Sequence, residues 1–532
     1  MNIASILHDE ATRRAGTTAI VHRGRTIAFD DLDRAASAAA RDLRAAGLGP
    51  GNRVLVLVPM SIELYIVLIA LFRLRATGVI VDPSAGRARL DQSVTRVAPD
   101  ALVAVPKAHL LRLFSRAVRR IPLRIAIGGY VPFARRIRVC TTGVPDTVEP
   151  CPPDTPAIIT FTSGSTGEPK AAVRTHGFLL AQHRALAASL SLIAGEVDLT
   201  TLPIFLLANL ASGVTSVVPD ADLRAPGAID PGPVLAQVRE TGATRTVASP
   251  AFLLRLAGHP SASAGLAGME RIFTGGAPVF PRALDALAAA APGAEIVAVY
   301  GSTEAEPIAE IERRQISEDD RRAMREGAGL IAGVPDPAVN LAILNDRWST
   351  PLGPWTEDDF AREVLPPLAD FRGTTAGTTS TGEIVVSGEH VLAGYLDGRG
   401  DPETKIRVGE RVWHRTGDAG YLDRSGRLWL LGRCAAKVDD EHGRVYPFAV
   451  ECAASDVEGL RRSAFVRRDG ARALVVEPAG GADTAAVIER VRERLTWARL
   501  ADVLVVARIP VDARHNAKVD YPALEKLLAA RR

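Results

Sequence analysis

The sequence predicts an α/β protein whose large N-terminal part contains parallel or mixed sheets wrapped by helices. Three observations support this prediction. Short apolar runs alternate with helical patterns through the first hundred residues. The 532 residues exceed what one hydrophobic core organises, so we expect more than one domain. The composition, 47% hydrophobic and 23% charged, is that of a globular protein and gives no reason to expect disorder.

The segment Val54–Val81 shows the alternation most clearly. Val54–Val58 predicts a buried strand, Ser61–Arg75 a helix with a serine N-cap, and Gly78–Val81 the next strand. Such a βαβ unit implies parallel strands covered by helices. The segment is the most hydrophobic in the chain, but polar or helix-breaking residues interrupt it at Pro59, Glu63, Arg73 and Arg75. A buried α/β layer is therefore expected here, and a membrane span is not.

Charge and cysteine content exclude several classes of protein. The balance of 64 basic and 61 acidic residues gives a net charge of +3, which does not indicate nucleic-acid binding. The four cysteines lack a CxxC pair or a metal-ligand spacing, so neither a disulfide nor a zinc site is expected: Cys140, Cys151, Cys434 and Cys452. Asp9, Glu10 and the lack of a long apolar run argue against a signal peptide. We expect a cytoplasmic protein.

A hydroxyl-rich turn follows the short apolar run Ala157–Ile159, which predicts a buried strand. Glycines let the backbone approach a polyphosphate, hydroxyls donate to its oxygens, and a lysine adds positive charge. The predicted phosphate-binding residues are Thr162, Ser163, Gly164, Ser165, Thr166, Gly167 and Lys170. The alternative is a polar surface loop. The GxxxxGK[ST] P-loop is excluded, because no serine or threonine follows Lys170 to hold magnesium.

The stretch Thr162–Lys170 resembles the signature loop of the acyl-adenylate-forming superfamily, whose members include acyl-CoA synthetases, luciferases and adenylation domains. The resemblance covers essentially the whole chain. It implies the adenylate-forming fold, with a large N-terminal domain over residues 1–433 and a small, mobile α+β lid domain over residues 434–532. It also implies that a carboxylic acid reacts with ATP, assisted by Mg²⁺, to give an acyl-adenylate and pyrophosphate.

Two further motifs match superfamily motifs that bind the nucleotide. Phe273–Pro278 predicts a strand running into a glycine turn, where backbone can lie against a purine, although any strand end may carry two glycines. In Ala298–Glu304, the resemblance implies that Tyr300 stacks on adenine, Thr303 contacts phosphate and Glu304 binds Mg²⁺. An aromatic face suits a base, and a carboxylate suits a small divalent ion. Taken alone, Glu304 fits an ordinary surface acid.

The resemblance completes the nucleotide site with residues from later in the chain. Asp418 is expected to accept both ribose hydroxyls, and Arg433 to reach the ribose or a phosphate. The predicted adenine and ribose set is Gly275, Gly276, Ala277, Pro278, Tyr300, Gly301, Ser302, Asp418 and Arg433. Lys518 occupies the place of the catalytic lysine, which neutralises charge between the substrate carboxylate and the α-phosphate. The predicted catalytic set is Lys518, Thr303 and Glu304.

Several positions depart from the superfamily pattern. Phe205 matches the aromatic position of a Pro-x-Phe motif that lines the acyl pocket, but Leu206 follows where most relatives have histidine. Phe205 alone fits a core aromatic equally well. Ala435 stands where the lid pivot is usually Asp or Lys. With Arg96–Ala101, Val105–Leu110 and Arg514–Lys518, these departures resemble one branch, the β-lactone synthetases of long-chain olefin biosynthesis.

That branch implies a 2-alkyl-3-hydroxy fatty acid whose own hydroxyl attacks the activated carbonyl, giving a β-lactone and AMP. Three alternatives stay open. An acyl-CoA or acyl-carrier-protein ligase would use coenzyme A or a carrier as acceptor, which the missing pivot disfavours. A secondary-metabolite enzyme would use another acceptor, as in amine–nitrite diazotisation. A nucleotide-binding scaffold without turnover is disfavoured by the joint presence of Lys170, Glu304, Asp418 and Lys518.

Residues 107–138 form a basic stretch in which arginines alternate with apolar residues. A solvated face whose apolar side packs on the domain is the first interpretation. The alternative is peripheral association with a partner enzyme or a membrane surface.

Overall fold

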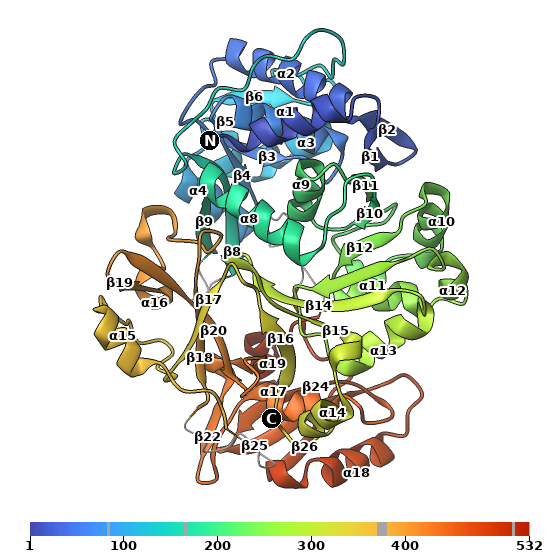
Figure 1. Ribbon diagram of the computed structural model, residues 1–532, viewed down its shortest axis with the longest axis vertical. Coiled ribbons are helices and arrows are strands. Elements are labelled where there is room, and N and C mark those ends of the chain that lie inside the picture. Colours follow the sequence, from blue (N-terminus) through green and yellow to red (C-terminus); the bar gives the residue numbers. More distant parts are fainter. Residues whose placement is uncertain (82–85, 164–168, 370–379, 513–516, 531–532) are drawn as a thin grey trace.

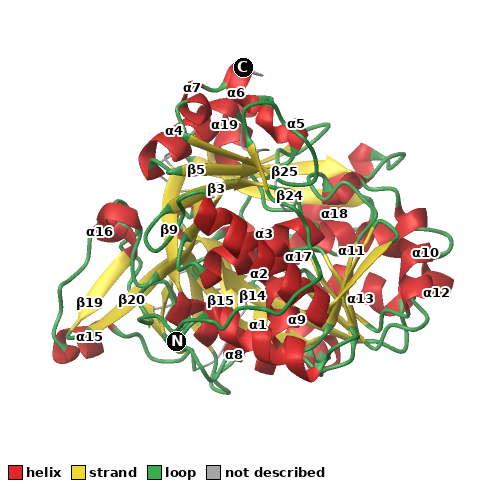
Figure 2. Ribbon diagram, turned by 90° about the horizontal axis from the view of Figure 1, so that it is seen from above, coloured by secondary structure: helices red, strands yellow, loops and turns green. Residues whose placement is uncertain are grey.

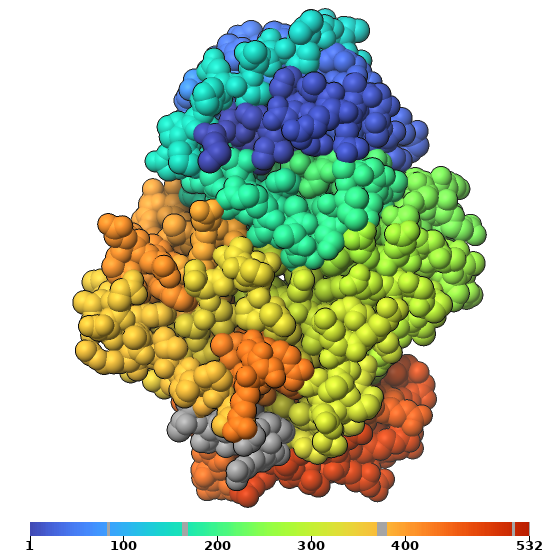
Figure 3. Space-filling model, viewed as in Figure 1, coloured from blue at the N-terminus to red at the C-terminus, as the bar shows by residue number. Residues whose placement is uncertain are grey.

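The computed structural model describes residues 1–81, 86–163, 169–369, 380–512 and 517–530. Figure 1 shows the first 160 residues at the top of the molecule, two flanking parts in the middle and the last hundred residues at the bottom. The space-filling view in Figure 3 shows the same succession on the surface. The mixed α/β architecture confirms the predicted fold class.

The first sheet has the strand order β7-β6-β5-β3-β4-β8-β9 and is parallel except for the antiparallel pair β8–β9. Its strands are β3 (Arg53–Leu57), β4 (Thr77–Ile80), β5 (Ala101–Ala104), β6 (Leu123–Ala126), β7 (Arg135–Arg136), β8 (Pro156–Ser163) and β9 (Pro169–Thr175). Strand β3 is buried on both faces: Val54 and Val56 pack in one hydrophobic cluster, Leu55 and Leu57 in another. This two-sided burial explains the continuous apolar run in the sequence.

Helices cover both faces of this sheet. One face packs against α2 (Phe29–Ala45) and α3 (Ile62–Arg73), and the other against α4 (Arg87–Val97). Helix α3 begins as predicted, because the Ser61 hydroxyl accepts a hydrogen bond from the Leu64 N–H at 3.4 Å. The predicted βαβ unit is thereby confirmed.

The second sheet runs in the order β17-β18-β20-β21-β16-β15-β14-β13-β12-β10-β11-β1-β2, with β19 pairing β20. The stretch from β1 to β14 through β11, β10, β12 and β13 is parallel, and the stretch from β14 to β17 is antiparallel. The bounds are β1 (Thr18–His22), β2 (Arg25–Ala28), β10 (Val197–Thr200), β11 (Thr215–Val218), β12 (Arg245–Ala248), β13 (Arg271–Gly275), β14 (Glu295–Ser302), β15 (Ala305–Glu312), β16 (Leu330–Pro335), β17 (Asn340–Leu344), β18 (Gly382–Ser387), β19 (Lys405–Val408), β20 (Arg411–Leu422) and β21 (Leu428–Arg433).

The remaining helices of this large part pack around the two sheets. They are α1 (Ile3–Arg13), α8 (His176–Ser189), α9 (Pro203–Ala211), α10 (Pro231–Thr241), α11 (Pro250–Ala257), α12 (Ala262–Gly265), α13 (Pro281–Ala290), α14 (Glu318–Arg325), α15 (Glu357–Glu363) and α16 (Asp401–Thr404). Four of them begin with proline, a residue that fits the first helical turn because it needs no amide donor there.

The described C-terminal residues form two small sheets and three α-helices. The elements are β22 (Val438–Asp440), β23 (Gly443–Val445), α17 (Pro447–Ala454), β24 (Leu460–Arg468), β25 (Ala471–Pro478), α18 (Thr484–Arg494), β26 (Asp502–Val505) and α19 (Tyr521–Ala529). In the described part of the chain, these sheets pair with no strand that precedes Arg433. The domain boundary at residues 433 and 434 stays a prediction with which this topology agrees.

Glu451 is a buried carboxyl group on α17. It accepts hydrogen bonds from the Phe465 N–H at 2.9 Å and the Tyr521 hydroxyl at 2.6 Å. Burial is the main cause that raises its pKa from 4.5 to about 7. The folded state therefore binds this proton more tightly than the unfolded state, and stability decreases as pH rises from 4.5 through about 7.

Glu451→Gln mimics the protonated acid and should remove this pH dependence. Urea unfolding at different pH values measures this effect. The free energy of unfolding of the variant, relative to that of the wild type, should increase by on the order of 2 kcal/mol from about pH 5 to about pH 8. Glu489→Gln, on the exposed side of α18, is the matched control and should follow the wild type. Equal pH dependence in the wild type and Glu451→Gln would contradict the assignment.

The basic stretch 107–138 includes three short helices, α5 (Pro106–His109), α6 (Leu111–Phe114) and α7 (Arg116–Arg119), and the strands β6 and β7. Within the described ranges, no helix has the length and apolarity needed to cross a bilayer.

Candidate active site

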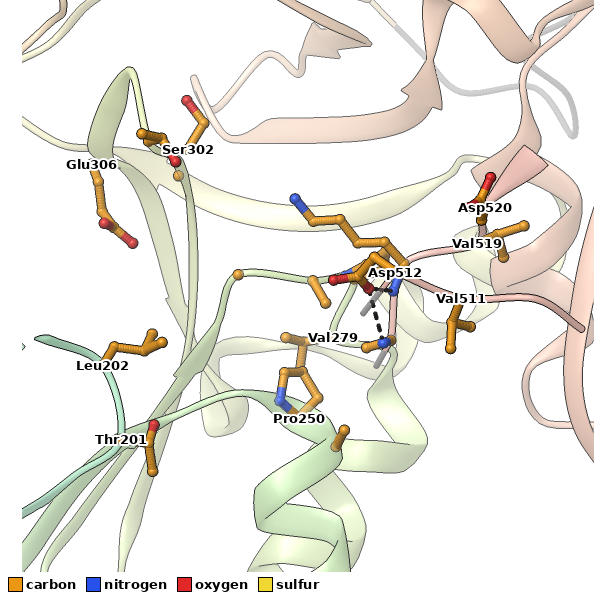
Figure 4. Close-up of a pocket in the computed structure, with 18 of the residues that line it drawn as sticks. Thr201, Leu202, Pro250, Val279, Ser302, Glu306, Val511, Asp512, Val519 and Asp520 are labelled. Carbon is orange, nitrogen blue, oxygen red and sulfur yellow. Dashed lines mark hydrogen bonds between the residues drawn. The ribbon is translucent and has the colours of Figure 1, made fainter. Parts of the chain in front are cut away.

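A large open cavity of about 3190 Å³ collects residues from both sheets and from the C-terminal elements. Figure 4 shows Ser302 and Glu306 on one side of it and Asp512 and Asp520 on the other. The predicted site residues that line the cavity are Lys170, Gly276, Ala277, Pro278, Tyr300, Gly301, Ser302, Thr303, Glu304, Asp418, Arg433 and Lys518. Residues nearly 350 positions apart in sequence therefore meet at one site.

Part of the predicted phosphate loop cannot be compared with the structure. Gly164, Ser165, Thr166 and Gly167 lie outside the described residues, and Thr162 and Ser163 belong to the backbone of β8. Lys170 is described on the neighbouring strand β9, where it lines the cavity. Gly275 does not line the cavity: a Cβ there would lie 2.5 Å from the Val299 carbonyl oxygen, so close packing of β13 on β14 accounts for this glycine.

Three residues, on strands β14, β20 and β21 of the second sheet, form the part of the cavity predicted to bind the nucleoside. Tyr300 on β14 donates its hydroxyl to Asp418 Oδ2 at 2.9 Å. Arg433 ends β21 opposite Asp418 in the ladder, with its Nε 3.3 Å from Asp418 Oδ1. Burial raises the pKa of Tyr300 well above its usual value, so the phenol stays a hydrogen-bond donor. A carboxylate has about four acceptor positions, and Asp418 retains acceptor capacity for the ribose hydroxyls.

Asp418→Asn should weaken ATP binding by about tenfold or more, because a hydrogen bond to a charged acceptor contributes about 1.5–3 kcal/mol. Tyr300→Phe is the matched control: it keeps the aromatic face for adenine and removes only the hydroxyl. We expect the control to change affinity by less than about threefold. Isothermal titration calorimetry with ATP measures both effects, and an unchanged affinity of Asp418→Asn would refute the ribose role.

Glu304, the predicted metal ligand, is held by contacts from a distant loop. The Tyr395 hydroxyl donates to Glu304 Oε1 at 2.8 Å, and the Leu392 N–H donates to the Glu304 carbonyl at 2.7 Å. Next to it, Arg174 donates to the Thr303 carbonyl at 2.8 Å. These contacts fix the turn after β14. Among the described residues, no group of three or more His, Cys, Asp or Glu side chains could hold a metal. One carboxylate beside bound phosphates suits Mg²⁺, which keeps several waters and uses few protein ligands.

Two buried lysines flank the ring of Tyr395. Lys170 Nζ lies 5.6 Å and Lys405 Nζ 5.4 Å from the ring centroid. Lys405 donates to the Leu392 carbonyl and lies 3.2 Å from His414 Nδ1. Burial lowers the pKa of Lys405 to about 8 and that of His414 to about 3. His414 is therefore neutral near pH 7, and the site presents positive charge next to Glu304.

Sequence reasoning missed Tyr395 and Lys405 and assigned no role to His414. Tyr395 follows β18 and Lys405 begins β19, so only tertiary folding brings them to Glu304. Burial also lowers the pKa of Lys170, while the acids Glu403, Glu304 and Asp401 oppose this effect.

The backbone at Lys518 is held by hydrogen bonds with Asp512. The backbone N–H groups of Ala517 and Lys518 donate to Asp512 Oδ1 at 3.2 and 2.8 Å, and the Asp512 N–H donates to the Lys518 carbonyl at 2.9 Å. The dashed lines in Figure 4 mark the two bonds to the Asp512 carboxylate. Lys518 lies on the cavity wall.

One arm of the cavity is apolar. Its lining includes Val58, Met60, Leu64, Leu68, Ile204 and Leu207. Phe205 is not among the lining residues: it is 5% exposed and packs with Leu186, Val247 and Phe273. Its packing agrees with the core interpretation that the sequence left open, and its acyl-pocket role stays a prediction that this packing does not favour.

The fold and the site define a class of enzyme. Residues 7–396 match the family model described as AMP-binding enzyme, and the chain belongs to this family. It is an ATP-dependent, adenylate-forming enzyme. The predicted superfamily membership is thereby confirmed.

Individual relatives within this family are also similar to the chain. The chain is 34% identical to the olefin β-lactone synthetase of Stenotrophomonas maltophilia, over 97% of this chain and 96% of the relative. It is 31% identical to the olefin β-lactone synthetase of Xanthomonas campestris, over 93% and 89%. A feruloyl-CoA synthase from Amycolatopsis is 28% identical over 82% and 79%. Among solved structures, the amide bond synthetase McbA from Marinactinospora thermotolerans superposes with a TM-score of 0.77, at 22% identity and 99% coverage of both chains, which shows a shared fold.

Proposed function

We propose that the enzyme activates a 2-alkyl-3-hydroxy fatty acid with ATP and closes it to a β-lactone. The observation that carries the proposal is the meeting of Lys518, Glu304 and Asp418 in one cavity that also has an apolar arm. The charged part suits a nucleotide and a carboxylate, and the apolar arm suits alkyl chains. The two β-lactone synthetase relatives, at 34% and 31% identity, support the proposal that the substrate's own 3-hydroxyl group accepts the acyl group.

In the first half-reaction, a substrate carboxylate oxygen attacks the α-phosphorus of ATP and pyrophosphate leaves. Asp418 and Tyr300 hold the nucleoside, and Lys170 lies on β9, the strand beside the predicted phosphate loop. Lys518 neutralises charge that builds up between carboxylate and α-phosphate. Mg²⁺, when bound by Glu304, supplies further neutralisation of phosphate charge.

In the second half-reaction, the 3-hydroxyl oxygen attacks the acyl carbon, AMP leaves with the former carboxylate oxygen, and the hydroxyl proton passes to solvent. A β-lactone is the internal ester of a 3-hydroxy acid, so substrate and nucleophile are one molecule. Such a reaction needs no second substrate and benefits from proximity. Ala435 at the usual pivot position agrees with this, because no thioester-forming rotation is required.

The residue Arg433 ends β21 and the separate small sheets follow it. The proposal therefore includes a mobile lid domain over residues 434–532. This lid carries Lys518 to the nucleotide.

AMP release tests the proposal. A 2-alkyl-3-hydroxy acid, its 3-deoxy analogue and a simple fatty acid would each be incubated with ATP and Mg²⁺, with and without coenzyme A. We expect sustained AMP release from the hydroxy acid alone, independent of coenzyme A, with a product one water lighter than the acid. Turnover that requires coenzyme A would instead establish a ligase.

A further inference from the structure

Apolar side chains are exposed at the short helix α6. Leu110, Leu113 and Phe114 are 55%, 64% and 64% exposed. Single exposed apolar residues are ordinary in folded proteins, but three within five positions form an apolar tip. The next loop of the same sheet carries a second one: Tyr130 and Phe133, after β6, are 78% and 94% exposed.

The two apolar tips belong to one corner of the molecule. Strands β5 and β6 are parallel neighbours, so α5 and the loop after β6 leave the sheet at the same edge. Gly129 lies against the first residue of α5, because a Cβ there would lie 2.6 Å from Pro106 Cγ. Figure 2 shows α5, α6 and α7 beside α4 along one rim of the molecule.

This corner carries strong positive charge. Between residues 101 and 139 the chain has nine Lys and Arg residues and no Asp or Glu, although the net charge of the whole chain is only +3. In the part of the chain that the structure describes, none of the nine forms an ion pair. Exposed apolar side chains surrounded by basic side chains without ion-pair partners are complementary to an anionic lipid surface. The apolar side chains can enter the region between the headgroups and the acyl chains, and the basic side chains can contact the anionic headgroups.

The cavity reaches this corner. Lys107 and Ala108 on α5 and Leu111 on α6 line it, and Leu113 and Phe114 follow within three residues. We propose that the α5–α6 corner docks the enzyme onto anionic membranes with the cavity rim at the lipid surface. Resting on the proposed function, this contact brings a hydroxy fatty acid from the bilayer to the rim of the cavity that holds the proposed active site.

Vesicle co-sedimentation of the full chain tests the docking surface. The probes are vesicles of phosphatidylcholine alone and of phosphatidylcholine with phosphatidylglycerol. We expect binding to the anionic vesicles that weakens with salt, and much weaker binding to the neutral ones. The double variant Leu113→Ser/Phe114→Ser should lose about tenfold or more in affinity, because both side chains lose apolar area for the bilayer. Arg116→Glu, a charge reversal at an exposed position of α7, should lower the affinity for anionic vesicles several-fold.

Ile193→Ser is the matched control, because Ile193 is 55% exposed in the loop between α8 and β10. It should bind vesicles like the wild type. Leu113, Phe114 and Arg116 do not line the cavity. AMP release from a short, water-soluble hydroxy acid by the variants at these positions should therefore equal that of the wild type.

Absence of binding to anionic vesicles, or equal binding by the wild type and the Leu113→Ser/Phe114→Ser variant, would overturn the docking proposal. The latter result would direct attention to an acidic protein partner. Vesicle binding is measured without turnover, so a failure of the proposed function, seen as no AMP from any hydroxy acid, is a separate result.

Discussion

Lys518→Ala should lower the rate of acyl-adenylate formation by about 10²–10³-fold while ATP binding persists. The reason is electrostatic: the carboxylate and the α-phosphate are both anionic, and removing one preorganised donor from such a site typically costs this much. Hydrogen bonds with Asp512 hold the backbone N–H and carbonyl groups of the lysine, so the alanine variant should keep the local fold. Acid-dependent exchange of labelled pyrophosphate into ATP measures the first half-reaction alone.

Lys526→Ala is the matched control for this prediction. Lys526 is exposed on α19 at the same cavity, so its removal changes the general charge and leaves the predicted contact intact. The control should keep its rate within about twofold. Full exchange activity in Lys518→Ala would remove this residue from the mechanism.

Glu304→Gln should have the second largest effect, a loss of about 10²-fold or more in adenylation together with a higher Mg²⁺ requirement. The amide keeps the size of the side chain but loses the negative charge that a hard cation needs. A Mg²⁺ titration of pyrophosphate exchange separates weaker metal binding from a slower chemical step.

Two further variants sharpen the Glu304 experiment. Tyr395→Phe removes only the hydroxyl that orients Glu304 Oε1, and should cost about tenfold in apparent Mg²⁺ affinity, in the range found for groups that orient a metal ligand. Glu306→Gln changes a carboxylate on the same side of the cavity and should stay within about threefold of the wild type. Equal losses in Glu304→Gln and Glu306→Gln would mean that general charge, and not a metal ligand, is responsible.

The parts of the fold that local sequence determines were predictable. The run around Val54 predicted a strand buried on both faces, and Ser61 marked the start of α3, since an N-cap acts within one helical turn. The pairing of Asp418 with Arg433 across β20 and β21 agrees with the expectation that both reach the nucleotide.

The parts that depend on tertiary folding were not predictable. Tyr395 and Lys405 give no local signal of their contact with the Glu304 region, because these distant segments of the chain meet there only after tertiary folding. At Phe205, a local motif suggested a role that the tertiary packing does not favour. A motif position suggested a pocket residue, whereas packing against Leu186 and Phe273 buries the ring in the core.

The most direct test of the central claim follows oxygen atoms through the reaction. A 2-alkyl-3-hydroxy acid labelled with ¹⁸O in both carboxylate positions would be converted with unlabelled ATP, and the AMP and the lactone would be analysed by mass spectrometry. Carboxylate activation followed by hydroxyl attack predicts one ¹⁸O in AMP and one in the lactone carbonyl. Unlabelled AMP with both ¹⁸O atoms kept in the lactone would contradict the account, because the hydroxyl and not the carboxylate would then have been activated.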